Sequence, residues 1–179
     1  MRQICIRSAA LIFFIMKTLK FIFIIFLAVS ISCETKDDID KQKPEIDLSL
    51  VGAFPNNCDT LYFGESFTFK ALFSDNAELG SVQAFNIDIH HNFDHHSHST
   101  EVTECNMSPK KSPVNPFLFI QDYDIPAGLN KYETNYTVTI PTGNSSGLFD
   151  EGDYHFFISL TDQSGWSAQK GISIKILKR

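Results

Sequence analysis

The chain has 179 residues, of which 43% are hydrophobic and 20% charged, and its 15 Lys and Arg against 21 Asp and Glu give a formal charge of -6. This composition is typical of a globular protein and excludes a disordered, collagen-like or coiled-coil chain. The acidic balance also argues against nucleic acid or anionic lipid as a partner, because both require a basic face.

The N-terminal region has the pattern of an export signal. Two lysines in segment 16–20 precede the apolar run 21–31, and a small residue comes before Cys33. About 11 apolar residues are too few to cross a bilayer of about 30 Å. Residues 1–32 are therefore predicted to be a leader and lipoprotein signal peptide, with Met16 as the true start.

A second interpretation of this region is one longer membrane helix over residues 9–31. Lys17 and Lys20 would then lie in the middle of the span, where each costs about 2.5–3.5 kcal/mol. Cleavage before Cys33 instead removes four basic residues and no acidic one. That would leave one domain's worth of chain with a formal charge of -10.

Cys33 stands where a bacterial lipoprotein carries its lipid-modified cysteine. The sequence that begins there, Cys-Glu-Thr-Lys-Asp-Asp, resembles the acidic Lys-Asp-Asp export tag of surface lipoproteins in the Bacteroidota. The resemblance implies an outer-membrane lipoprotein that faces outward and is lipidated at Cys33. Residues 33–43 are charged and poor in apolar side chains, so they are predicted to form a flexible acidic tether.

Two cysteines, Cys58 and Cys105, remain for the folded domain. Outside the cytoplasm an isolated pair is most simply a disulfide. Its separation of 47 residues corresponds to a stabilisation of roughly 4 kcal/mol on the chain-entropy model. The alternative is that one or both thiolates bind a metal ion beside the histidines of the chain.

Residues 44–179 are predicted to form one all-β domain. Segments such as 45–51 and 66–73 alternate apolar and polar residues, which is the pattern of strands with one buried and one solvent-facing side. Further strands are expected at 82–90, 116–121, 132–140, 154–160 and 172–177. About seven short strands separated by turns, with no sustained helical period, indicate a β-sandwich.

The C-terminal part of this domain is predicted to be a hairpin. Residues 152–162 and 167–177 are its strands, and Asp162 and Gly165 supply the turn, since aspartate bonds back to the backbone and glycine accepts a positive φ. The hairpin resembles the last two strands of bacterial immunoglobulin-like and cadherin-like domains. Five histidines also lie between residues 90 and 98. With these histidines and the leader, span 44–179 resembles an uncharacterised family of Bacteroidota lipoproteins. The resemblance implies a single immunoglobulin-like (cadherin-like) β-sandwich and brings no established activity with it.

Five of the six histidines lie between residues 90 and 98. Neutral imidazole binds metals near pH 7, and such tracts favour Zn²⁺, with Cu²⁺ and Ni²⁺ as alternatives. His90 ends a predicted strand on its solvent-facing side, and His96 and His98 point the same way if the chain is extended. The predicted site is His90, Asp94, His96 and His98, with His91 and His95 as rivals or as ligands of a second ion.

Other arrangements of the tract stay open. On a helix, His91, His95 and His98 would share one face, although the intervening residues are poor helix formers. Glu101 and Glu104 could add oxygen ligands. The simplest alternative is a polar surface loop whose histidines are solvated, or which binds ions only weakly, as an affinity tag does.

A catalytic interpretation is less favourable. Segment 90–95 is similar to the His-x-His-x-Asp-His motif of metallo-β-lactamase-type hydrolases, but Asn92 replaces the second histidine and removes one ligand. The mature chain is also too small for that fold. Neither a nucleophile arrangement nor a phosphate-binding glycine loop can be picked out, so the chain is predicted not to be an enzyme.

Acidic turns at 75–76, 122–124 and 150–153 suggest Ca²⁺ as a second kind of ion. Cadherin-like domains bind Ca²⁺ between repeats, whereas only one domain is expected here. Ordinary turn chemistry is therefore the preferred interpretation of these residues.

Together these features predict a surface-anchored lipoprotein that binds a transition-metal ion, most simply Zn²⁺, through its His-rich loop and acts in metal acquisition or homeostasis. Its partners would be the outer membrane, through the lipid anchor, and an outer-membrane receptor or transporter. The alternative is a structural or adhesion module that binds a glycan or a partner protein, with the histidines incidental.

Overall fold

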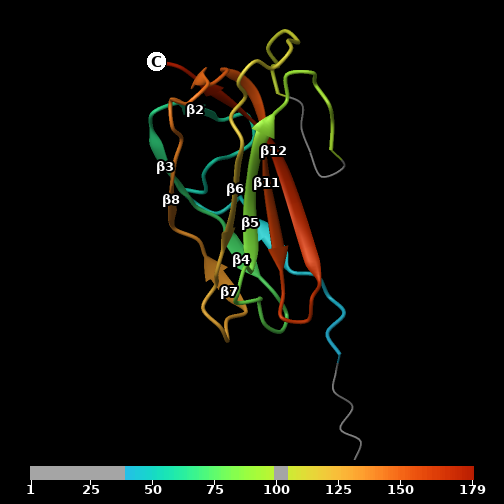
Figure 1. The fold of residues 1–179 in the computed structure, drawn as a ribbon. Helices are drawn as coiled ribbons and strands as arrows, with labels where there is room; N and C mark the ends of the chain where they lie inside the picture. Colours follow the sequence, from blue (N-terminus) through green and yellow to red (C-terminus); the bar gives the residue numbers. More distant parts are fainter. Residues whose placement is uncertain (1–38, 99–104) are drawn as a thin grey trace, which may run out of the picture. The chain divides into compact units, whose positions relative to one another are not determined.

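The computed structural model describes residues 39–98 and 105–179, and a compact unit runs from Asp40 to Arg179. Its regular secondary structure is entirely β within the described residues (Figure 1). The predicted leader, Cys33 and the start of the tether lie outside the described residues, as do Glu101 and Glu104. The described part of the chain contains no helix with the length and hydropathy needed to cross a membrane.

Twelve strands follow one another along the described residues. They are β1 Glu45–Asp47, β2 Thr60–Tyr62, β3 Ser66–Phe69, β4 Leu72–Ser74, β5 Phe85–His91, β6 Phe119–Tyr123, β7 Lys131–Glu133, β8 Tyr136–Thr139, β9 Gly143–Asn144, β10 Gly147–Leu148, β11 Gly152–Thr161 and β12 Ser167–Leu177. The all-β prediction is therefore confirmed, with more and shorter strands than expected.

The largest sheet has five strands in the order β2-β12-β11-β5-β6. Its centre is the predicted C-terminal hairpin, in which Gly152 pairs with Ile176 at one end and Thr161 with Ser167 at the other. Gly165 in the turn has a φ of 90°, which only glycine adopts at low cost. Figure 1 shows β11 running between β12 and β5, so this strand has a partner on each side.

Two predicted strands are each divided between different sheets. Segment 66–73 becomes β3, paired with β8, and β4, which lies between β1 and β7; segment 132–140 divides in the same way into β7 and β8. At the break the buried Ala71 N–H donates to Thr134 Oγ1, at 2.8 Å, instead of joining a ladder. The alternation of apolar and polar residues continues through both breaks, so the sequences of 66–73 and 132–140 each have the pattern of a single strand.

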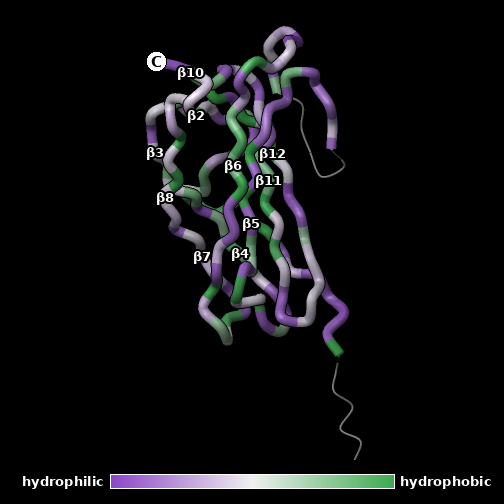
Figure 2. The backbone as a smooth tube through the Cα atoms, viewed as in Figure 1, coloured by the Kyte–Doolittle hydropathy of each residue, from purple (hydrophilic) through white to green (hydrophobic). Residues whose placement is uncertain are grey.

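The core lies between the five-stranded sheet and strands β3, β4 and β8. Phe69 and Phe156 bring their ring centroids within 5.8 Å across this space, and Phe73 and Phe85 within 5.0 Å. Figure 2 shows the hydrophobic residues concentrated along β5 and β11. Burying each such side chain contributes about 1.5–3 kcal/mol, which fixes the strand register and leaves the other face of β5 and β11 for polar groups.

Candidate metal centre

Two histidines lie side by side on the outward face of β5 and β11. Ile87 and Ile89 of β5 enter the core, so the alternating residues Asp88 and His90 point the other way. His155 of β11 is paired with His90 in the antiparallel ladder, and the two ring centroids are 5.3 Å apart. His155 is fully buried, whereas a quarter of the His90 side chain is exposed.

The segment that follows β5 brings two further histidines over this pair. One nitrogen each of His90, His96, His98 and His155 lies within 4.8 Å of one nitrogen of every other member; these four residues are the histidine group. The Nε2 atoms of His90 and His98 are 3.4 Å apart. A tetrahedral Zn²⁺ with Zn–N distances of about 2.0–2.1 Å separates two ligand nitrogens by about 3.4 Å. The group can therefore surround one small ion.

Two carboxylates orient two of these rings by hydrogen bonding to their Nδ1 atoms. Asp88 Oδ1 lies 2.9 Å from His90 Nδ1, and Asp94 Oδ1 lies 2.6 Å from His96 Nδ1. The hydrogen bond with His96 lowers the pKa of the Asp94 carboxyl below its usual range, so this acceptor stays ionised. A ring whose Nδ1–H donates to a carboxylate keeps Nε2 unprotonated, which is the form that binds a metal.

An aromatic ring forms the floor of the site. Phe157 stacks on His90, with centroids 5.6 Å apart and an interplanar angle of 7°, and meets His98 edge-on at 4.6 Å. Phe157 is paired with Gly171 of β12, where an added Cβ would lie only 2.4 Å from the Phe157 ring. The glycine therefore leaves room for Phe157 to lie flat on the sheet beneath the imidazoles.

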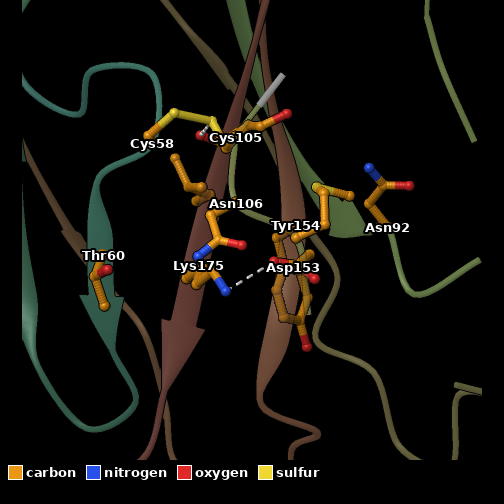
Figure 3. Close-up of a pocket in the computed structure, with 11 residues that line it drawn as sticks. Cys58, Thr60, Asn92, Cys105, Asn106, Asp153, Tyr154 and Lys175 are labelled. Carbon is orange, nitrogen blue, oxygen red and sulfur yellow. Dashed lines mark hydrogen bonds and ion pairs between the residues drawn. A yellow bond between two sulfur atoms is a disulfide. The ribbon is translucent and has the colours of Figure 1, made fainter. Parts of the chain in front are cut away.

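The strand that supplies His155 also anchors the described residues that precede and follow segment 99–104. Asp153 receives a hydrogen bond from the Ser108 N–H at 2.7 Å on its carboxylate and one from the Asn92 N–H at 2.8 Å on its carbonyl oxygen. Lys175 lies 3.6 Å from the same carboxylate, as the dashed line in Figure 3 shows. The described parts on both sides of segment 99–104 are thus attached to β11.

A disulfide joins Cys58 to Cys105, as the sequence predicted, and it fixes the start of the second described part (Figure 3). Its formation removes both thiolates from consideration as metal ligands, because a sulfur in a disulfide carries no thiolate charge. The alternative of a mixed cysteine and histidine site is therefore wrong.

Three residues of the predicted ligand set lie outside the histidine group. Asp94 hydrogen bonds to His96 instead of facing the common point. His91 follows His90 in a strand and so points to the other face, where its ring stacks on Phe93 at 4.9 Å. His95 has a φ of 59°, and its Nε2 lies 2.8 Å from the carbonyl oxygen of Ser108.

The sequence prediction missed His155, the most deeply buried member of the group. A lone histidine far from the tract gives no local signal of metal binding. One sign was present: Tyr154, Phe156 and Ile158 occupy one face of β11, so Asp153 and His155 must share the other. Only the pairing of β11 with β5 places that face beside His90.

A family described as a domain of unknown function (DUF4625) matches residues 31–177. The chain belongs to the DUF4625 family. The description of DUF4625 names no activity, so membership alone assigns no role to the histidine group. Among curated proteins no match is found.

Two solved adhesin structures from Streptococcus sanguinis are similar to this DUF4625 chain. A mutant of the SrpA adhesin has 14% identity and a TM-score of 0.38 over 78% of this chain and 57% of that one. The sialic acid binding region of the SK1 adhesin has 17% identity and a TM-score of 0.39 over 78% and 31%. The chain thus spans little more than half of the first structure and under a third of the second.

Proposed function

We propose that the protein captures a transition-metal ion, with Zn²⁺ as the best fit, at His90, His96, His98 and His155. The observation that carries this proposal is the convergence of four imidazoles, three from the tract and one from the neighbouring strand. Four nitrogen ligands suit Zn²⁺ best, and Cu²⁺ or Ni²⁺ next.

The surroundings of the group distinguish it from a flexible affinity tag. Asp88 and Asp94 orient two of the rings, and Phe157 closes one side of the site. Orienting partners of this kind raise metal affinity about 10–100-fold. A solvated tract has no buried ligand, whereas His155 is fully buried.

The number of ligands favours holding an ion over catalysis. Catalytic zinc sites keep three protein ligands and leave the fourth position for water or substrate, whereas structural and storage sites use four. A group of four histidines would occupy all tetrahedral positions. The protein therefore acts as a binding component and not as an enzyme.

The biological setting that we propose follows from the sequence and the strand arrangement. A five-stranded sheet facing β3 and β8, with a long C-terminal hairpin, supports an immunoglobulin-like β-sandwich. The leader and Cys33 support lipid anchoring in the outer membrane of a Bacteroidota bacterium. There the domain would present its ion to a receptor or transporter in metal acquisition or homeostasis.

Calorimetric titration of Zn²⁺ into the metal-free protein tests the proposal. We expect one ion per chain with micromolar or tighter affinity, lost when His96 and His98 are both changed to Ala. The matched control is His95→Ala, because His95 belongs to the same tract and lies outside the group. Millimolar affinity that is insensitive to either change would refute the proposal and favour the adhesion module.

A further inference from the structure

Three aspartates from separate parts of the chain converge at the C-terminal end of β11, whereas His155 lies near the N-terminal end of this strand. Asp40 begins the compact unit, Asp75 follows β4, and Asp162 follows β11. One carboxylate oxygen of each lies within 4.8 Å of one oxygen of each of the others. These three residues are the aspartate group. A strand rises about 3.3 Å per residue, so Asp162 lies roughly 20 Å along β11 from His155 and the two groups are separate.

Each aspartate has one oxygen in use and one left over. Asp162 Oδ1 accepts the Trp166 N–H at 2.8 Å, Asp75 Oδ2 accepts the Ala77 N–H at 2.7 Å, and Asp40 Oδ1 accepts the Gln42 N–H at 3.0 Å. The second oxygen of each carboxylate is buried and has no hydrogen-bond partner among the residues that the structure describes. For Asp162, which is only 3% exposed, such an oxygen is costly unless a ligand binds it.

No positive side chain neutralises the aspartate group within the described residues. The ion pairs found within the described ranges, 39–98 and 105–179, do not include Asp40, Asp75 or Asp162. Hydrogen bonds from the Gln42 backbone and from Asn76 lower the pKa of Asp40, which keeps this carboxyl ionised at neutral pH. Three carboxylates this close must share a cation or bind a proton.

We propose that the aspartate group is a Ca²⁺ site that fixes the start of the domain to two of its turns. Ca²⁺ prefers carboxylate oxygens at 2.3–2.6 Å and accepts irregular geometry, so two of its ligands can be up to about 5 Å apart. Water completes the coordination shell, because three side chains supply only part of the 6–8 oxygens that Ca²⁺ requires. The described members of the group offer only carboxylate oxygens, so a transition metal is a poor fit here.

The single tryptophan of the chain lies beside this group and provides a probe. Trp166 Nε1 donates to the Asp40 carbonyl oxygen at 3.0 Å, and the Trp166 N–H bonds Asp162. Its side chain is 41% exposed, so any change in its hydration alters its fluorescence. Occupation of the site by an ion can therefore be followed optically without a label.

The experiment titrates Ca²⁺ into the full-length protein in detergent after treatment with a chelator. We expect a saturable change in Trp166 fluorescence with a Kd of about 0.1–1 mM, as in extracellular calcium modules. At about 5 mM Ca²⁺ the Tm should rise by about 3 °C or more. Mg²⁺ should bind more weakly, because it demands stricter geometry.

Two variants decide whether the aspartate group is responsible. Asp162→Asn keeps an oxygen that accepts the Trp166 N–H and removes one negative charge. In the presence of chelator, the Tm of this variant should equal or exceed that of the native protein. Added Ca²⁺ should then produce no response. Asp40→Asn tests the same point at the more exposed edge of the group, in case Asp162→Asn does not fold. Asp124→Asn is the matched control, because Asp124 accepts a backbone N–H from Gln83 outside the group.

Three results would overturn the proposal. One is no saturable response up to about 10 mM Ca²⁺. Another is an unchanged Ca²⁺ affinity in both Asp162→Asn and Asp40→Asn. The last is a Tm that falls equally in Asp162→Asn with and without Ca²⁺, since this would indicate a purely structural role. Zn²⁺ titration of the same variants should be normal, so failure here is distinguishable from failure of the histidine group.

Discussion

His155 lies opposite His90 in the ladder between β11 and β5, so the most buried ring of the candidate metal centre comes from outside the histidine tract. Strand pairing therefore fixes half of the ligand group in a rigid sheet. His96 and His98 come from the segment that follows β5 and complete the group. The candidate site thus combines two histidines held by strand pairing with two from the segment after β5.

The first prediction concerns the buried ligand. His155→Asn should weaken Zn²⁺ binding at least about 10-fold, because loss of one of four ligands costs more than loss of an orienting partner. Calorimetry measures the affinity, and a thermal melt confirms that the variant is folded. His95→Asn provides the comparison. Equal losses in the two variants would mean that burial of His155 serves packing and not metal binding.

The second prediction concerns Asp88 and Asp94, whose carboxylates hydrogen bond to His90 and His96. Asp88→Asn and Asp94→Asn should each reduce Zn²⁺ affinity about 10–100-fold without changing the stoichiometry, since an amide holds the histidine tautomer less well. Asp122→Asn is the control, because Asp122 bonds Asn86 on the same sheet outside the site. A loss of one bound ion in Asp94→Asn would instead show that Asp94 is itself a ligand.

The third prediction concerns the disulfide. Replacing both Cys58 and Cys105 with Ser should lower the free energy of unfolding by up to roughly 4 kcal/mol, as measured by urea denaturation. Zn²⁺ affinity should fall as well, because the disulfide fixes the start of the described segment whose Ser108 binds Asp153, two residues before His155. An affinity equal to that of the native protein would show that the hydrogen bond between Ser108 and Asp153 is sufficient without the disulfide.

The fourth prediction concerns alkaline pH. Burial raises the pKa of Tyr154, whose hydroxyl donates to the Asp150 carbonyl oxygen at 2.5 Å. The folded protein therefore keeps this phenol protonated at pH values where the unfolded chain, with a tyrosine pKa of about 10, releases the proton. Stability should be full below about pH 10 and fall as the pH rises further.

Urea denaturation at about pH 8 and about pH 11 measures this effect. Tyr154→Phe should lose about 1–2 kcal/mol at the lower pH, because the Phe117 N–H and the Asp150 carbonyl then lack their partner. The same variant should lose less stability than the native protein between the two pH values. A steeper loss in the variant would contradict the assignment to Tyr154.

Local patterns predicted the all-β class and the C-terminal hairpin because both depend on neighbouring residues. Alternation along 152–162 and 167–177 and the turn at Gly165 were sufficient. The division of 66–73 between two sheets was not predictable, since Thr134, which occupies the break, is distant in the sequence. Parallel pairing of β2 with β12 likewise leaves no mark in either segment.

The same distinction applies to the two candidate ion sites. The density of histidines in residues 90–98 predicted three members of the histidine group, whereas His155 became a candidate only through strand register. The sequence drew attention to Asp75 as part of an acidic turn. Its convergence with Asp40 and Asp162 depends on tertiary structure, so no spacing rule would have found the aspartate group.

Because β11 contributes to the histidine group, the proposed metal binding would also link metal supply to the lifetime of the protein. An unfolded chain separates His155 from the tract, so an ion that needs all four rings binds only the native form. At a free concentration 100 times its Kd, such a ligand adds about 2.7 kcal/mol to the free energy of unfolding. Proteases cut chains that open transiently, and the unfolded fraction of the protein would be about a hundred times smaller at this metal concentration. Scarcity of the metal would thus shorten the survival of each molecule, and abundance would lengthen it.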